Sequence, residues 1–195
     1  MTSVAVAGGA EQWSAVAWTW GTAPAERELA FPCDRHLPGT SEALFRAVDV
    51  NASPGVVFRW LCQLRVAPYS YDWIDNFGRS SPRELTPGLD ALAVGQRAMG
   101  FFTLVEFERD GHLTFLARSG PLGEWAVTYR VLARGERGAR LVVKLVVRYP
   151  DGLVGWVLRR VAPWADLVMM RKQLLTLAGL AEAGEASRAR ELPRR

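Results

Sequence analysis

The clearest pattern in the chain is an alternation of apolar and polar residues that runs, with interruptions, from residue 96 to residue 149. The alternating stretches are 96–108, 112–118, 124–133 and 140–149. A period of two indicates strands, and short glycine-containing segments such as Asp110-Gly111 join them, so sequential neighbours are predicted to pair as antiparallel strands. We therefore expect a sheet with one covered, concave apolar face.

The phase of the alternation divides the strand residues between the two faces of this sheet. The residues predicted to point inward are Val105, Phe107, Leu113, Phe115, Trp125, Val127, Tyr129, Val131, Leu141, Val143, Leu145, Val147 and Tyr149. Those predicted to point outward are Glu106, Glu108, Arg118, Glu124, Thr128, Arg130, Lys144 and Arg148.

Helical patterns lie on either side of these strands. A first strand is predicted over Leu44–Val50, followed by a helix that begins after Ser53, with Pro54 in its first turn, and continues to about Leu64. After Pro150 a long helix is predicted, broken or kinked near Pro163. Its apolar stripe consists of Leu167, Met170, Leu174, Leu177, Ala178 and Ala181. The simplest way to cover both apolar surfaces is an α+β fold in which the curved sheet wraps around this C-terminal helix.

This order of elements resembles the helix-grip fold of the START-like or SRPBCC superfamily, which includes polyketide cyclases and the birch-pollen-allergen family. The resemblance covers residues 41–183, leaving 1–40 as an extended lead-in and 184–195 as a basic, flexible tail. Three segments, TWGTAPAERELAFPCDRHLPG, RAVDVNASPGVVFRWLCQL and YSYDWIDNFG, look like a bacterial SRPBCC subgroup that itself implies no reaction.

The resemblance implies a hydrophobic cavity between the sheet and the C-terminal helix. The function expected from it is binding of an apolar, lipid-like or polyketide-like small molecule, without a cofactor. The alternative is a cofactor-independent cyclase or aromatase acting on a polyketide-like substrate. Whether the protein is an enzyme stays open at this point.

The block YSYDWIDN combines aromatic rings with hydroxyl, carboxylate and amide groups, as binding pockets do. Its candidate ligand contacts are Tyr69, Tyr71, Asp72 and Trp73. In the cyclase alternative, Asp72 and a pocket tyrosine would move protons. In a purely structural interpretation, Trp73, Ile74 and Phe77 would instead anchor a short helix to the core.

Two arginines interrupt the apolar phase of their strands. Arg46 is in phase with Val48, and Arg97 is in phase with Met99, so both are predicted to project toward the concave face unless a bulge at Gly100 intervenes. An unpaired guanidinium in an apolar interior is costly. Each arginine must therefore lie at a wet rim, bind an anionic ligand, or pair with an internal acid, for which Asp72 and Asp75 are the candidates.

The remaining candidate ligand contacts are interior residues, which line a cavity or fill it. They are Phe115, Trp125, Tyr129 and Tyr149 on the strands and Met170 and Leu174 on the helix. Tyr129 and Tyr149 are the more informative pair, because a buried phenol needs a hydrogen-bond partner.

Composition narrows the function further. Hydrophobic residues make up 49% and charged residues 23% of the 195 residues, which is typical of a folded globular chain. The formal charge is +4, but the basic residues are scattered and indicate no nucleic-acid partner. The dominance of arginine over lysine is typical of a GC-rich bacterial genome, and a homodimer is compatible with the sequence.

Motifs for phosphate, dinucleotide, zinc or nucleophile-elbow chemistry are missing from the sequence. Cys33 and Cys62 are predicted to be free thiols, and His36 and His112 to be surface residues. No stretch predicts a membrane span or a signal peptide, so a cytoplasmic location is expected.

Overall fold

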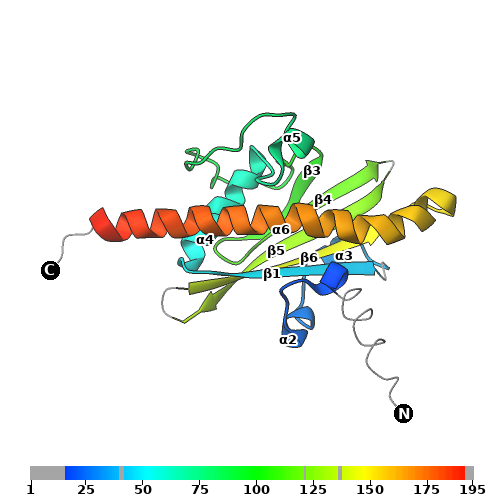
Figure 1. Ribbon diagram of the computed structural model, residues 1–195, viewed down its shortest axis with the longest axis horizontal. Coiled ribbons are helices and arrows are strands. Elements are labelled where there is room, and N and C mark those ends of the chain that lie inside the picture. The colour runs from blue at the N-terminus through cyan, green and yellow to red at the C-terminus, as the bar shows by residue number, and fades with distance from the viewer. Residues whose placement is uncertain (1–15, 40–41, 121, 136–137, 192–195) are drawn as a thin grey trace, which may run out of the picture.

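The computed structural model describes residues 16–39, 42–120, 122–135 and 138–191. Six strands form one antiparallel sheet in the order β1-β6-β5-β4-β3-β2. The strands are β1 (Glu42–Val50), β2 (Arg97–Ala98), β3 (Phe102–Glu108), β4 (His112–Gly120), β5 (Gly123–Arg134) and β6 (Gly138–Arg148). The helices are α2 (Pro24–Arg27), α3 (Cys33–His36), α4 (Pro54–Cys62), α5 (Asp72–Asp75), α6 (Gly152–Glu191) and the 3-10 turn η1 (Gln63–Arg65). Helix α6 lies across the sheet (Figure 1), which confirms the predicted α+β helix-grip arrangement.

Helix α4 begins where the sequence predicted, with Ser53 as the residue before its first turn and Pro54 inside that turn. The backbone N–H and the hydroxyl of Ser53 both donate to the carboxylate of Glu185 on α6, at 3.2 and 2.8 Å. These bonds satisfy groups that the start of α4 would otherwise leave unpaired. They fix α4 against the second half of α6.

Helix α6 is longer and more regular than expected. It runs without a break from Gly152 to Glu191 with Pro163 inside it, and its first turns lean away from the axis of the rest (Figure 1). Residues 184–191, which the sequence had assigned to a flexible tail, form its last turns. Residues 192–195 lie outside the described residues.

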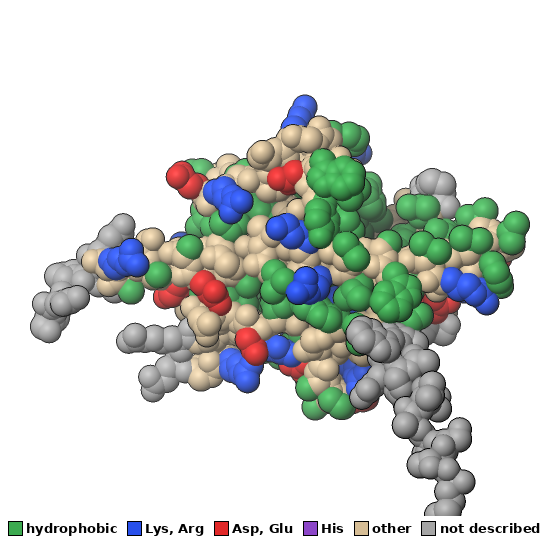
Figure 2. All heavy atoms as spheres, in the orientation of Figure 1, with side chains coloured by type: hydrophobic (Ala, Val, Ile, Leu, Met, Phe, Trp, Pro, Cys, Tyr) green, Lys and Arg blue, Asp and Glu red, His purple; other side chains and the backbone are tan. Residues whose placement is uncertain are grey.

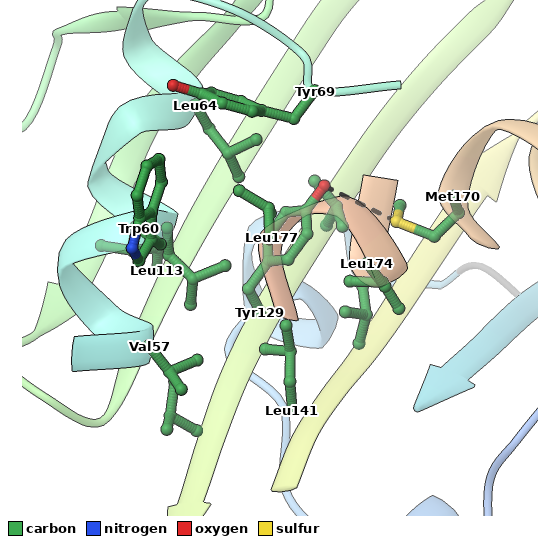
Figure 3. Close-up of a cluster of buried hydrophobic side chains, with 14 of the residues drawn as sticks. Val57, Trp60, Leu64, Tyr69, Leu113, Tyr129, Leu141, Met170, Leu174 and Leu177 are labelled. Carbon is green, nitrogen blue, oxygen red and sulfur yellow. Dashed lines mark hydrogen bonds between the residues drawn. The ribbon is translucent and has the colours of Figure 1, made fainter. Parts of the chain in front are cut away.

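The concave face of the sheet and the inward face of α6 enclose the main core. Figure 3 shows Leu113, Tyr129 and Leu141 from the strands facing Leu174 and Leu177 from α6, with Trp60 of α4 beside them. All six are buried. Burial of these side chains is the main force that holds the helix in the sheet, at about 25 cal/mol per Å² of apolar surface.

The convex face is also covered, which corrects the prediction of one covered face. Phe31, Cys33 and Leu37, in and around α3, pack on this side of the sheet. The backbone N–H of Cys33 donates to the hydroxyl of Thr128 at 2.9 Å, and Thr128 is fully buried. The segment around α3 therefore covers the back of the sheet, whereas Trp18 and Trp20 of the lead-in pack against the main core.

The predicted strand over 96–108 is interrupted. Met99 and Gly100 adopt φ values of 46° and 79° and form a turn between β2 and β3. A register shift between Leu104 and Glu106 then changes the phase of β3. As a result Leu104 lies in the main core, whereas Val105 packs on the convex side, contrary to prediction.

Candidate ligand-binding interior

The most unusual group in the main core is a hydrogen-bonded pair of polar side chains, Tyr129 of β5 and Gln173 of α6. The Tyr129 hydroxyl donates to Gln173 Oε1 at 2.6 Å, and Gln173 Nε2 donates to the carbonyl oxygen of Pro68 at 2.6 Å. Both side chains are at least 95% buried, since 1% of Tyr129 and 5% of Gln173 is exposed. Burial raises the pKa of the Tyr129 phenol far above its usual value, so the hydroxyl keeps its proton.

Two methionine side chains border this pair. The Tyr129 oxygen lies 3.8 Å from both Met99 Sδ and Met170 Sδ, and Gln173 Nε2 lies 3.6 Å from Met99 Sδ. Figure 3 shows the Met170 sulfur directed at the Tyr129 hydroxyl. Methionine is unbranched and adapts to differently shaped neighbours. We call Met99, Tyr129, Met170 and Gln173 the Tyr129 cluster.

The loops that close over the Tyr129 cluster carry backbone strain. Tyr69 and Met99 have φ values of 57° and 46°, in the left-handed region that residues with a Cβ seldom adopt. Tyr69 follows Pro68, whose carbonyl accepts from Gln173. Met99 is held by its backbone N–H, which donates to the carbonyl of Leu64 at 2.9 Å. Backbone strain at Tyr69 and Met99 thus lies on two sides of the Tyr129–Gln173 pair.

Tyr69 itself is buried beside Trp60, with ring centroids 6.1 Å apart. Neither the Tyr69 hydroxyl nor the Trp60 indole N–H has a hydrogen-bond partner among the described residues. Desolvation raises the pKa of Tyr69 to about 12. Two unpaired donors in an apolar environment are costly, and both lie on the α4 side of the interior.

Trp125 and Tyr149 pack edge to face at the other end of the interior, with ring centroids 6.1 Å apart. The guanidinium of Arg159 lies over the Tyr149 ring at 5.5 Å. Burial raises the pKa of Tyr149 to about 12. This pair lies near the start of α6, four positions along β5 from Tyr129.

Arg46 points inward as predicted and is 1% exposed, but its partner is neither Asp72 nor Asp75. Its Nη2 lies 2.8 Å from Asp166 Oδ2 on α6. The guanidinium also donates to the carbonyls of Phe45, Ala17 and Pro163 at 2.8, 2.7 and 3.2 Å. Desolvation raises the pKa of Asp166 to about 6 even with Arg46 beside it. Arg46 is thus an internal structural cation whose donors are largely occupied.

The YSYDWIDN block faces away from the interior except at Tyr69. Asp72 accepts from the backbone N–H of Ser81 at 2.9 Å, and Asp75 accepts from the Ser70 hydroxyl at 2.7 Å. Tyr71 is half-buried at the start of α5.

The aromatic residues of this block are not an anchor for α5. Trp73 is 76% and Phe77 94% exposed, so the structural interpretation in which they pack on the core is wrong. Trp73 also lies outside the interior that was predicted to bind the ligand.

Arg97 differs from its prediction as well. It is exposed, and its neighbour Ala98 is buried instead. Strict alternation predicted that Arg97 points inward. The turn at Met99 and Gly100 and the shifted phase of β3 reverse this orientation.

The space between the sheet and α6 is filled by side chains in this structure. Phe115 packs edge to face on Tyr129 at 6.0 Å, and Met170 and Leu174 lie in the same core cluster. Two hollows among the described residues are open ones at the surface. One, of about 300 Å³, lies beside Ser53, Arg59 and Asp110, and the other, of about 500 Å³, lies beside Asp49 and Arg134.

Sequence reasoning missed three of the polar or adaptable groups in this interior: Met99, Asp166 and Gln173. A signal existed for two of them, because Asp166 and Gln173 are seven residues apart and border the stripe of Leu167, Met170 and Leu174. Polar residues beside a buried stripe need internal partners. Met99 had no such signal, since its position depends on the irregular turn.

Both histidines lie on the convex side and gather around Glu106. His36 Nε2 is 2.8 Å and His112 Nε2 3.5 Å from the Glu106 carboxylate, and Arg35 also pairs with it. The histidine side chains are 26% and 14% exposed, so they are less accessible than predicted. The described residues contain no group of His, Cys, Asp or Glu that fits a metal ion.

No protein-family model and no curated protein sequence matches this chain. Solved structures do. A hypothetical protein from Helicobacter pylori aligns at 16% identity and a TM-score of 0.50, covering 78% of this chain and 95% of its own. A START superfamily protein from Mycobacterium smegmatis aligns at 14% identity and a TM-score of 0.44, covering 74% of this chain and 97% of its own. An aromatase/cyclase from Streptomyces aligns at 12% identity and a TM-score of 0.44, covering 77% of this chain and 96% of its own.

The strand order and the covering C-terminal helix give the chain a START-like helix-grip fold, in agreement with the resemblance in the sequence. Identities at this level establish the fold alone. No described helix has an apolar run of the length that crossing a bilayer requires.

Proposed function

We propose that the protein binds one apolar small molecule, lipid-like or polyketide-like, between the concave face of the sheet and α6. The observation that carries this proposal is the Tyr129–Gln173 pair. It supplies a phenol and an amide in the middle of an interior that is made mainly of apolar side chains. Pockets for small molecules combine an apolar lining with a few placed polar groups in this way.

The polar end of the ligand would lie at the Tyr129 cluster. A ligand hydroxyl can accept from the Tyr129 hydroxyl and donate to Gln173 Oε1, so it could replace the bond between Tyr129 and Gln173 without leaving either group unpaired. The apolar body of the ligand would contact Phe115, Met170 and Leu174. These side chains now fill the space, and the two methionines of the cluster would give way most easily, because methionine adapts to new neighbours.

Entry would pass through the loops around Tyr69 and Met99. Both residues hold strained backbone conformations next to the Tyr129 cluster. A rearrangement that relaxes them would offset part of the free energy needed to open the interior.

We propose ligand binding without catalysis. The carboxylate of Asp72, considered for proton transfer in a cyclase, is held by Ser81 in the loop after α5 and not at Tyr129. Arg46 is held by Asp166 and three carbonyls, so recognition of an anionic ligand by Arg46 forms no part of the proposal.

Equilibrium binding of dansylated undecanoic acid, followed by its fluorescence, tests this proposal. The native chain should bind it saturably with one site. Gln173→Leu should weaken binding about fivefold, since a lost hydrogen bond to a bound polar group is worth about 1 kcal/mol. The matched control is Thr176→Val, which also removes a side-chain hydrogen bond from α6, but at the surface.

Two results would overturn the proposal: the absence of saturable binding to the native chain, or equal affinity in the native chain and both variants. If binding is found, native mass spectrometry of the purified protein, with organic extraction of whatever accompanies it, would identify the class of the natural ligand.

A further inference from the structure

Helix α6 is apolar on its outward face over the first half of its length, which is unusual for a helix at the surface of a sheet. Leu153 is 77% exposed, and the exposed residues that follow it along the same half are Val154, Trp156, Val157, Val161, Trp164 and Val168. An amphipathic surface helix normally carries polar residues there. Although Arg159 and Arg160 are also exposed in this half of α6, so many exposed apolar side chains indicate that a second surface covers them.

A second exposed apolar group lies beside this one. Trp73, Ile74 and Phe77 in and after α5 are exposed, and so is Phe101 in the turn between β2 and β3. The α5 segment adjoins α6 where the Ser70 hydroxyl lies 3.8 Å from Met169 Sδ. Figure 2 shows hydrophobic side chains gathered over α5 and along the first half of α6 on one face of the molecule.

We name these two groups together the exposed apolar surface. Single exposed hydrophobic residues are ordinary, but contiguous apolar patches of several hundred Å² mark interaction sites. Because α5 and the outward side of α6 are visible from the same direction, a flat partner could contact both at once (Figures 1 and 2).

Asp151, just before α6, is an exposed acid at one edge of the exposed apolar surface, but most of the charges that border this surface are positive. They belong to Arg79, Arg97, Arg160, Arg171 and Lys172, and within the described part of the chain none of the five takes part in an ion pair. The acids of the α5 segment, Asp72 and Asp75, accept hydrogen bonds from the neutral groups of Ser81 and Ser70 and keep their charge, but they are fewer than the five cations. The border therefore favours a negatively charged partner.

We propose that the exposed apolar surface docks the protein on an anionic lipid bilayer, lying on it without crossing it. Tryptophan, phenylalanine and aliphatic side chains beside arginine and lysine that have no ionic partner are typical of an interfacial surface. In such a surface the apolar groups enter the headgroup region and the cations meet lipid phosphates. A second copy of the chain fits less well, because a two-fold contact would bring the same cations against one another.

This docking goes beyond ligand binding in the interior and does not rest on it. If both hold, the protein would take up or deliver its ligand at a membrane. The two are separable in experiment, because vesicle binding is measured without ligand and dansylated undecanoic acid binding without vesicles.

The test is co-sedimentation of the full chain with vesicles of phosphatidylcholine alone or of phosphatidylcholine mixed with phosphatidylglycerol. We expect binding to the mixed vesicles that weakens as salt is added, because salt screens exposed charges. The double variant Trp73→Ser, Phe77→Ser should lose most of this binding, while Val94→Ser, which alters another exposed apolar residue outside the surface, should keep it.

The contribution of the cations to vesicle binding is tested with one double variant and one control variant. Arg171→Gln with Lys172→Gln should weaken binding to the mixed vesicles, and Arg190→Gln on the far end of the same helix should not. All changed residues are exposed, so the thermal unfolding of each variant should match that of the native chain.

Equal binding to both vesicle types, or no binding to either, would overturn the proposal. Light scattering of the purified chain supplies the competing outcome. A stable dimer that Trp73→Ser with Phe77→Ser converts to a monomer would assign the exposed apolar surface to a second copy instead. Retained binding of dansylated undecanoic acid in that double variant would show that the interior is unaffected.

Discussion

The ion pair between Arg46 and Asp166 leads to an asymmetric prediction about stability. Arg46 bonds to three backbone carbonyls as well as to Asp166, whereas Asp166 has Arg46 as its ionic partner and its Oδ2 atom makes no aligned hydrogen bond. Removing Arg46 strands a buried carboxylate and takes one donor away from each of three carbonyl oxygens. Removing Asp166 leaves the guanidinium still bound by carbonyl oxygens.

The magnitude follows from these partners. Breaking a buried ion pair by deleting one member costs about 3 to 5 kcal/mol, and we expect Arg46→Met to lie in this range. Asp166→Asn should cost less than about 2 kcal/mol, because an amide leaves the carbonyl bonds of Arg46 in place. Arg46→Met combined with Asp166→Leu should be more stable than Arg46→Met alone, because the stranded carboxylate is then gone.

The assay is urea unfolding at neutral pH, followed by tryptophan fluorescence and by circular dichroism. Coincident transitions and equal slopes against urea concentration make the free energies comparable. Equal losses in Arg46→Met and Asp166→Asn, or a loss below about 1 kcal/mol in Arg46→Met, would refute the view that the carbonyl contacts dominate.

Two further predictions concern pH and the convex face. Burial raises the pKa of Asp166 from 3.8 to about 6, so between these values the folded chain holds a proton that the unfolded chain has released. The free energy of unfolding of the native chain minus that of Asp166→Asn should therefore fall as pH rises through this range, and a flat difference would contradict the raised pKa. Thr128→Val should cost about 1 to 3 kcal/mol by stranding the N–H of Cys33. Thr128→Ser, which keeps the hydroxyl, should cost clearly less, and equal losses would show that this bond does not hold α3 on the sheet.

The fold could be predicted because its determinants are local and periodic. Alternation over residues 124–133 and 140–149 placed Tyr129 and Val143 on the concave face, and the two are register partners in the structure. The Ser53-Pro54 start of α4 is likewise a local signal. The covering of the convex face was not predictable in this way, because Phe31 and Cys33 stand in a segment without periodicity.

The candidate site was predicted only in part, for reasons that differ between residues. Tyr129, Phe115, Met170 and Leu174 were correctly placed in the interior because they follow the strand and helix periods. Arg97 and Trp73 were misplaced because their orientation depends on turns, in which side-chain direction no longer follows a period. The partner of Arg46 was missed because Asp166 is 120 residues away in the sequence, and pairing over that distance is set by how α6 lies on the sheet.

The position of α6 on the sheet is itself specified by polar contacts. Asp166 and Gln173 are seven residues apart and so share one side of the helix, where Asp166 meets Arg46 of β1 and Gln173 meets Tyr129 of β5. A shift of the helix by one turn would preserve many apolar contacts, since leucine and methionine side chains are adaptable, but it would leave both polar pairs unpaired in the core.

These two contacts have different consequences for ligand binding. A ligand that bonds to Tyr129 and Gln173 would break the contact between these two residues. The contact between Arg46 and Asp166 would continue to hold the helix in register. The interior could then rearrange around the Tyr129 cluster without α6 leaving the sheet. The Tyr129–Gln173 bond could thus be exchanged for bonds to a ligand, while the Arg46–Asp166 ion pair stays in place. This arrangement suits reversible binding in a fold whose covering helix must remain on the sheet.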